Sequence, residues 1–513
     1  MKLRSIFVVV GLLLTSQLTH AEESATESAI INTNELAPQV LESYITTKTY
    51  TKVVIDDSYG KLLYESQVVT YQPQQLNKFY KKKICDNVYW FNCSYNLSNL
   101  QEYTNVDLDS ESGLFTANVE SIVGYKVNYT TQDLDNTARN VSGAVLIPSS
   151  NKPLKGMVLF YHYTVLNNRN VPSSFGKDET KLSPLMAASL ASAGYVVVMP
   201  DYIGQGDDES AIHPYILYPQ VNALSGIYML KLIAQLKSDI RYQLVNQKVP
   251  VYISGYSEGG AYALWAAKIL QDNPRYLTNY GFNLSKAIPI SGAYNLSNAT
   301  FRFLTEESEL ALTEAPYFVQ DKRVANFMRP ALVADVMNAY TKYNLQLDAS
   351  SGLVKEFYAC KACDGESGFS NLSEVFSSSK PEFVKYKTLY SSSQVTNYGE
   401  SNDSVLPLAN PDVLSSRGFY QQLISADIYN WKSNVPVDFL TLEHDSVVPR
   451  LNSETAYYAM AKQGSSKLNI TMVPNQNFKA SGYIPFTDIN IDHGSGIPFM
   501  FLFLRKSIMD GVN

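Results

Sequence analysis

Residues 251–260 read VYISGYSEGG, and this stretch decides the fold. Its first part is a short apolar run, typical of a strand that is buried on both faces of a sheet. A helix rich in alanine follows at 259–270. A G-x-S-x-G motif between a strand and a helix predicts a sharp turn, whose small residues let the helix approach the strand closely. The sequence therefore predicts Ser257 as a nucleophile on an α/β scaffold.

Further strands and helices alternate on both sides of this motif. Short apolar runs predict strands at 157–161, 195–199, 249–253, 286–290 and 435–442. Helical patterns lie between them, at 182–192, 221–236 and 259–270. This alternation predicts a mostly parallel sheet flanked by helices. Two alternating segments separated by a polar turn, 124–130 and 141–148, predict an antiparallel hairpin before it.

The chain of 513 residues is long enough for one large domain with insertions or for two domains. Residues 22–115 are polar and rich in tyrosine, and are predicted as an N-terminal extension of unknown role, with strand-like stretches at 52–55 and 67–71. The core is expected in two parts, 116–299 and 431–513. Residues 300–430 interrupt the alternation of strands and helices. We expect them to form an inserted cap or lid at the carboxyl edge of the sheet, where ligands bind in open α/β sheets. A peripheral insertion is the alternative. The apolar residues expected to line the cap recur at helical spacing and include Phe327, Met328, Leu332, Val333, Val336 and Met337.

The N-terminus predicts export. Residues 1–21 begin with basic side chains, continue with an apolar run at 6–14 and end in small residues at Ala21, which is the pattern of a cleaved signal peptide. The apolar run is too short for a membrane span of about 20 residues. The mature protein is therefore expected in the periplasm or outside the cell.

Four cysteines form two local pairs, Cys85 with Cys93 and Cys360 with Cys363. Export favours two short-loop disulfides. A zinc site built from both pairs is the alternative.

Composition limits the class of protein and its partners. Apolar residues make up 45% and charged residues 17%, which is typical of a globular protein. The net charge of −7, without a long basic run, argues against nucleic acid as a partner.

A serine hydroxyl needs an adjacent base to act as a nucleophile. In α/β folds with this motif the order along the chain is serine, then acid, then histidine. Histidine is scarce, with 5 in the chain, and only His493 lies far enough downstream of Ser257 to follow such an acid. The acid is expected in the loop after the strand at 437–442, where Asp445 is the prediction and Glu443 the rival. Asp438 lies within that strand and is predicted to be structural. The acid would hold the imidazole in the correct tautomer.

Two backbone N–H groups are needed to stabilise the oxyanion. One is expected from Glu258, directly after the nucleophile. The other is expected from Tyr163 or Thr164, after the strand at 157–161, while His162 is expected to shape that loop. The predicted chemistry uses no metal and no cofactor.

From about residue 120 to its end, the chain resembles the α/β-hydrolase superfamily, and specifically the secretory lipase group and its bacterial relatives. The stretches that carry the resemblance are 194–206, 213–215, 255–260 with Trp265, and 445–449. The early loop usually reads His-Gly-Thr in that family, whereas here a tyrosine stands in the middle, at 163. The resemblance implies hydrolysis of carboxylic esters, including acylglycerols, and so a small-molecule or lipid ester as substrate with transient contact with lipid surfaces.

Other functions use the same scaffold. A serine peptidase or an acyltransferase would need the same three residues, because the fold does not decide the acyl donor or acceptor. A catalytically inactive binding protein is a further alternative, against which the presence of serine, aspartate and histidine in the expected order argues.

Overall fold

The structure is a computed structural model. It describes residues 38–85, 97, 100–101, 104–110, 113–116, 118–165, 170–175, 182–208, 211–235, 248–305, 332, 335–336, 339–340, 342–343, 417–443, 445, 447–473, 493–494 and 496–510. The predicted signal peptide, residues 1–21, lies outside this range and stays a prediction.

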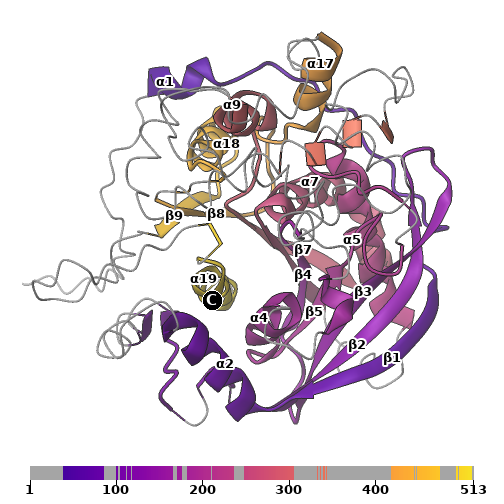
Figure 1. The fold of residues 1–513 in the computed structure, drawn as a ribbon, viewed down its shortest axis with the longest axis vertical. Coiled ribbons are helices and arrows are strands. Elements are labelled where there is room, and N and C mark those ends of the chain that lie inside the picture. Colours follow the sequence, from indigo (N-terminus) through magenta and orange to yellow (C-terminus); the bar gives the residue numbers. More distant parts are fainter. Residues whose placement is uncertain are drawn as a thin grey trace, which may run out of the picture. The chain divides into compact units, whose positions relative to one another are not determined.

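Within the described part of the chain, nine strands form one sheet in the order β1-β2-β3-β5-β4-β6-β7-β8-β9 (Figure 1). The strands are β1 (Leu62–Tyr71), β2 (Val119–Gln132), β3 (Ala138–Ser150), β4 (Gly156–Tyr161), β5 (Tyr195–Pro200), β6 (Val249–Tyr256), β7 (Phe282–Ile290), β8 (Val437–Leu442) and β9 (Leu468–Val473). Strands β4 to β9 run parallel, and β1, β2 and β3 join them through antiparallel pairs. The prediction of a mostly parallel α/β-hydrolase sheet flanked by helices is confirmed.

The helices cover both faces of this sheet. They are α1 (Pro38–Ser43), α2 (Pro73–Cys85), α4 (Leu182–Ala191), α5 (Pro219–Gln235), α7 (Glu258–Asp272), α8 (Pro274–Asn279), α9 (Phe301–Thr305), α17 (Arg417–Ala426), α18 (Leu451–Lys462) and α19 (Ile497–Asp510), with a 3-10 turn η1 (Pro172–Ser174) and a π-helical turn η2 (Leu296–Thr300). One apolar cluster contains α5 and α7, and a second contains α2, α4 and α19.

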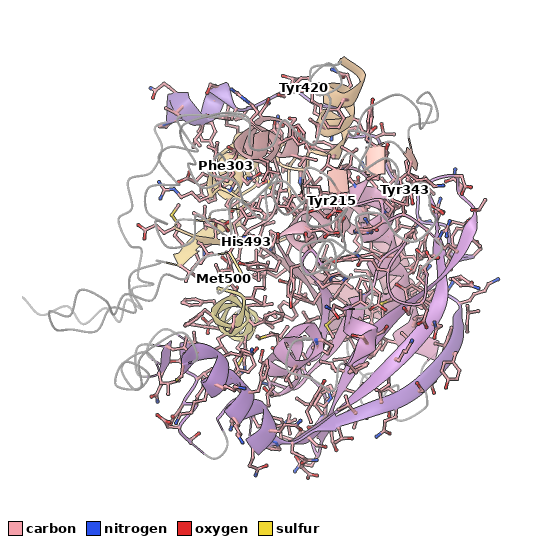
Figure 2. All side chains as sticks on the ribbon, in the orientation of Figure 1. Tyr215, Phe303, Tyr343, Tyr420, His493 and Met500 are labelled. Atoms are coloured by element: carbon pink, nitrogen blue, oxygen red, sulfur yellow. The ribbon has the colours of Figure 1, made fainter. Side chains whose placement is uncertain are left out.

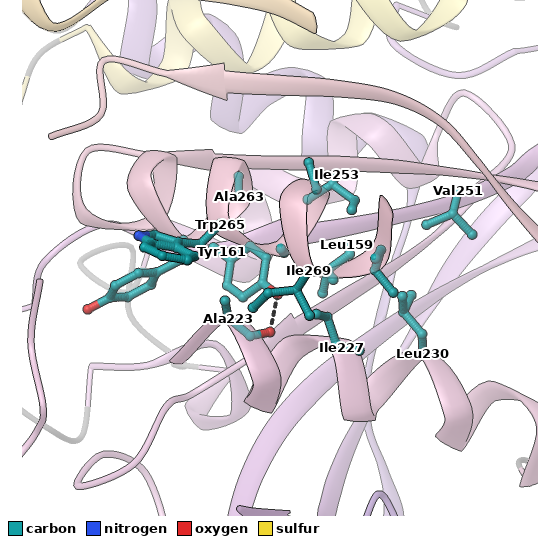
Figure 3. Close-up of a cluster of buried hydrophobic side chains, with 14 of the residues drawn as sticks. Leu159, Tyr161, Ala223, Ile227, Leu230, Val251, Ile253, Ala263, Trp265 and Ile269 are labelled. Atoms are coloured by element: carbon teal, nitrogen blue, oxygen red, sulfur yellow. Dashed lines mark hydrogen bonds between the residues drawn. The ribbon is translucent and has the colours of Figure 1, made fainter. Parts of the chain in front are cut away.

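Strand β4 shows how one strand supplies both apolar clusters. Met157 and Leu159 belong to the cluster with α5 and α7, whereas Val158 and Phe160 belong to the cluster with α4 and α19. Side chains alternate across a strand, so a run of apolar residues fills the core on both faces. Figure 3 shows part of the first cluster, in which the Tyr161 hydroxyl also donates to the carbonyl of Ala223 at 2.5 Å.

The predicted hairpin is present as β2 and β3, with Tyr125 opposite Val145. The strand-like interpretation of 52–55 is wrong, because these residues pair with no strand. Instead, Val53 and Ile55 pack on the cluster around α5 and α7, and the Asn273 side chain donates to the carbonyl of Val53 at 2.8 Å. The alternating apolar residues of 52–55 are thus used for packing on helices.

The extension predicted at 22–115 contributes strand β1 to the sheet and helix α2 to the helices that pack on it. Strand β1 pairs with β2 along its length and includes the predicted stretch 67–71. Helix α2 contacts α4 and α19, and the Tyr80 hydroxyl donates to the carbonyl of Met186 at 2.6 Å. Cys85 is the last residue of α2, whereas Cys93, Cys360 and Cys363 lie outside the described residues, so both cysteine pairings stay predictions.

The segment predicted at 300–430 leaves and re-enters the sheet between two adjacent parallel strands, β7 and β8. Its two ends meet: the Asp427 carboxylate accepts from the backbone N–H of Ser297 at 2.9 Å and from its hydroxyl at 2.6 Å. Of the apolar residues expected to line a cap, Leu332 and Val336 are buried. Phe327, Met328, Val333 and Met337 lie outside the described residues. Among the residues described, no helix has the length and apolar character to span a bilayer.

Candidate active site

The turn between β6 and α7 presents Ser257 in a strained conformation, with φ 57° and ψ −119°. Such a conformation costs on the order of 1–3 kcal/mol for a residue other than glycine and is concentrated at functional sites. Two neighbours must lack a side chain. A Cβ on Gly255 would lie 2.2 Å from the carbonyl oxygen of Gly259, and one on Gly259 would lie 2.1 Å from that of Tyr161. The motif therefore has the steric reason that the sequence predicts.

Asp445 follows β8 and is fully buried. Its Oδ1 accepts from the backbone N–H groups of Val447 at 2.9 Å and Val448 at 2.8 Å. These two bonds hold the carboxylate in a single orientation and compensate part of its lost hydration.

The Nδ1 atom of His493, a residue labelled in Figure 2, lies 2.7 Å from the second oxygen of Asp445, Oδ2. A carboxylate accepts hydrogen bonds, so Nδ1 carries the proton and Nε2 is the basic nitrogen of the neutral ring. The backbone N–H of Glu443, the rival acid, pairs with Val473 of β9. The structure thus brings together Asp445 and His493, which are 48 residues apart.

Tyr256 places His493 beside the turn. Its hydroxyl donates to the backbone carbonyl of His493 at 2.6 Å, and the two rings lie 5.0 Å apart. Because Tyr256 directly precedes Ser257, these contacts bring the imidazole to the turn that carries the predicted nucleophile. Tyr256 could not be foreseen from the sequence, since it occupies a variable position of the motif.

The predicted oxyanion residues lie in adjoining parts of the fold. Helix α7 begins at Glu258, and the N–H groups of the first turn of a helix have no acceptor within the helix. Tyr163 and Thr164 follow β4, which lies beside β6 in parallel register with Tyr161 opposite Gly255. The loop after β4 therefore leaves the sheet next to the turn at Ser257.

His162 is fully buried in that loop. Its Nδ1 lies 2.7 Å from the carbonyl of Tyr163. Burial, opposed by the charge of Glu258, lowers the pKa of His162 to about 4, so the ring is neutral near pH 7. Its contact with Tyr163 agrees with the expected role of shaping the loop.

His213 contacts the first residue of helix α7, Glu258. His213 Nε2 is 2.6 Å from the Oε1 atom of Glu258, and the hydroxyl of Tyr262 donates to the same oxygen at 2.7 Å. Burial acts to raise the pKa of Glu258, but the charge and hydrogen bond of His213, with further bonds, outweigh it and hold the pKa below its ordinary value. From the sequence, residues 213–215 are recognisable only as part of a family resemblance. The scarcity of histidine was the one signal that could have singled out His213.

The cofactor prediction was that none is required. Within the described residues, no group of three or more histidine, cysteine, aspartate or glutamate side chains is arranged to hold a metal ion. The zinc alternative for the cysteine pairs rests on residues outside that range.

The model of the secretory lipase family matches residues 170–278, a range that includes β5, α5, β6 and the turn at Ser257. No curated protein matches the chain at a significant level. The predicted resemblance to the secretory lipase group is confirmed over this range of the chain.

Two solved structures show the same fold. A protein of Legionella pneumophila assigned as a hydrolase has a TM-score of 0.62 at 20% identity, with 88% of this chain and 97% of that chain covered. The rice cell wall degrading esterase LipA from Xanthomonas oryzae has a TM-score of 0.60 at 18% identity, with 88% and 98% covered. At these identities the likeness concerns the fold alone.

Proposed function

We propose that this protein is an exported serine hydrolase that cleaves carboxylic esters through an acyl-enzyme. The observation that carries the proposal is the hydrogen bond between His493 and the buried Asp445, held by Tyr256 against the strained turn of Ser257. A serine in such a turn, with a histidine oriented by an acid, is the constellation of nucleophilic acyl transfer.

In this mechanism the Oγ atom of Ser257 attacks the ester carbonyl carbon while Nε2 of His493 accepts its proton. The negative charge on the carbonyl oxygen is stabilised by the N–H of Glu258 and by that of Tyr163 or Thr164. His493 then protonates the departing alkoxide, and an acyl group remains on Ser257. Water, deprotonated by His493, attacks the carbonyl carbon of this acyl-enzyme. His493 returns that proton to the Oγ atom of Ser257 as its bond to the acyl carbon breaks, and the carboxylic acid is released. Asp445 stabilises the imidazolium in both halves of the reaction.

A fluorophosphonate probe tests the nucleophile. The wild-type protein should be labelled on Ser257, and Ser257→Ala should not be labelled. A series of p-nitrophenyl esters, from acetate to long acyl chains, should then be hydrolysed, whereas peptide substrates should not. Labelling at another serine, or cleavage of peptides alone, would contradict the proposal. Turnover of triacylglycerol emulsions would extend the substrate class to lipid surfaces.

Export and the cysteine pairs share one test. The intact mass of the protein recovered after expression with its native N-terminus should lack residues 1–21 and the thiol hydrogens of all 4 cysteines. A retained N-terminus would contradict the signal peptide. Free thiols, together with one bound zinc ion, would replace the disulfides with the alternative site.

A further inference from the structure

The side chain of Glu258 is unusual for its place. The residue contributes the predicted oxyanion N–H, yet it carries a carboxylate whose side chain is only 1% exposed. A negative charge buried next to a developing oxyanion opposes the reaction, because like charges repel strongly where water is excluded. A structure that keeps glutamate here has to compensate its charge.

His213 provides that compensation. Its Nε2 lies 2.6 Å from the Glu258 carboxylate, and its Nδ1 lies 2.9 Å from the carbonyl oxygen of Ile203. Both partners accept hydrogen bonds, so both ring nitrogens must donate. An imidazole that donates from both nitrogens is an imidazolium. The pair therefore carries one positive and one negative charge, and its net charge is zero.

The environment of the other titratable groups near Glu258 disfavours a second negative charge. Burial and the neighbouring Glu258 raise the pKa of Asp335 well above its ordinary range, which favours its neutral form. Burial also raises the pKa of Tyr262 and Tyr215 well above the ordinary value. His162 is neutral for the reason given above. Among these groups, His213 supplies the positive charge.

The same short segment supports the other side of the oxyanion hole. The hydroxyl of Tyr215, two residues after His213, lies 3.1 Å from the Oγ1 atom of Thr164. Tyr215 has a left-handed backbone, with φ 42°, which is costly for a tyrosine. The carbonyl of Ile212 accepts a hydrogen bond from the hydroxyl of Tyr343, within the inserted segment. Tyr215 and Tyr343 are both labelled in Figure 2. One segment thus contacts both residues expected to stabilise the oxyanion.

We propose that His213 is a positioning residue for ester hydrolysis, which neutralises and orients Glu258 so that its N–H stabilises the oxyanion, while Tyr215 fixes Thr164. This inference rests on the proposed function. Because it concerns the transition state, it predicts a loss of kcat with little change in KM.

A set of charge variants tests the inference. His213→Gln leaves the carboxylate uncompensated, and should lower kcat on the order of 10²–10³-fold, which is the loss seen when one oxyanion donor is removed. Glu258→Gln removes the charge itself and should cost about tenfold at most. The double variant should recover at least about tenfold over His213→Gln, because neither charge remains. If His213 and Glu258 had only a structural role, the two single variants should lose equal kcat and the double variant should recover none of it.

Lys286→Met is the matched control for stability. Lys286 forms a partly buried ion pair with Asp438 at 3.2 Å, between β7 and β8. Its loss should lower the unfolding temperature without lowering kcat. If His213→Gln retained kcat within about threefold of the wild type, or if the double variant were no better than His213→Gln, the inference would be overturned.

A measurement on the wild-type protein keeps the inference testable if His213→Gln does not fold. The ¹⁵N chemical shifts of His213 at pH 7.5 should be those of an imidazolium, and a neutral ring would overturn the proposal. Failure of the proposed function can be distinguished from failure of this inference. If the wild-type protein hydrolysed no ester and was not labelled by a fluorophosphonate, the proposed enzymatic function would be refuted, whatever the charge state of His213.

Discussion

Two histidine–carboxylate pairs adjoin the turn at Ser257, and they differ in what the second ring nitrogen contacts. In the pair of His493 and Asp445, Nδ1 is bound to the carboxylate, so Nε2 carries the lone pair of the neutral ring. In the pair of His213 and Glu258, both ring nitrogens face acceptors. We propose that the first histidine exchanges a proton during the reaction, whereas the second is held as a cation by its two acceptors. The same two functional groups would then serve as a base in one place and as a fixed charge in the other.

The largest expected effect separates the two histidines. Ser257→Ala and His493→Ala should each lower kcat on the order of 10⁶-fold, because the members of a triad act as a unit. His213→Gln should keep at least about a thousandfold more activity than His493→Ala. Initial rates with a p-nitrophenyl ester, together with circular dichroism as the folding control, measure this. If the two histidine variants lost comparable kcat, the two histidine–carboxylate pairs would not differ in role as proposed.

The two carboxylates should also differ. Asp445→Asn should lower kcat on the order of 10⁴-fold, because an amide in place of the carboxylate favours the wrong tautomer of His493. Glu443→Gln is the matched control, since its backbone N–H pairs with β9, and the carboxylate that His493 contacts is that of Asp445. The acid would have to be reassigned if Glu443→Gln were the more damaging change.

A third histidine shows the effect of burial without a carboxylate partner. Burial lowers the pKa of His162 from 6.5 to about 4. Its contribution to stability is complete above pH 6.5 and is lost as the pH falls toward 4, because the unfolded chain then binds a proton that the folded chain does not. Burial raises the pKa of Asp201 from 3.8 to about 6, against hydrogen bonds from Ser142 and Ser173. That contribution is complete below pH 3.8 and is lost as the pH rises through 6.

These two opposite contributions should nearly cancel in the wild type between pH 4 and 6. Asp201→Asn removes one of them, so its free energy of unfolding should fall with decreasing pH more steeply than that of the wild type, by about 1.4 kcal/mol per pH unit. Urea unfolding at about pH 4.5, 5.2 and 6 measures how the free energy of unfolding depends on pH. The exposed Asp135→Asn is the control. Parallel pH profiles for wild type and Asp201→Asn would contradict the assignment.

The smallest expected effect concerns the inserted segment, which we propose covers the site and selects the acyl chain. Val336→Ala or Leu332→Phe should change the ratio of kcat/KM for long and short esters by about tenfold, while turnover of the shortest ester is retained. Both residues are buried, so thermal unfolding has to be followed in parallel. Tyr457→Ala, at an exposed position on α18, is the control. An unchanged chain-length profile with lowered stability would make the segment a structural insertion.

Much of this protein was predictable from local sequence. The strand before Ser257 and the helix after it follow from the apolar run, the small residues and the helical pattern of 251–270. The scarcity of histidine and the order of the three residues along the chain singled out His493 and left two acids, Asp445 and Glu443. These inferences succeed because strand periodicity and the steric demands of a tight turn act over a few residues.

Other features depended on the tertiary structure. Periodicity says which face of an element is buried but not what it will meet, so the packing of 52–55 on helices was not foreseeable from its alternation. The pairing of Asp445 with His493 and the pairing of His213 with Glu258 join residues that are 48 and 45 positions apart in the sequence. Whether a histidine acts as a base or as a fixed cation depends on the acceptors around its ring, and only the folded chain brings those acceptors together.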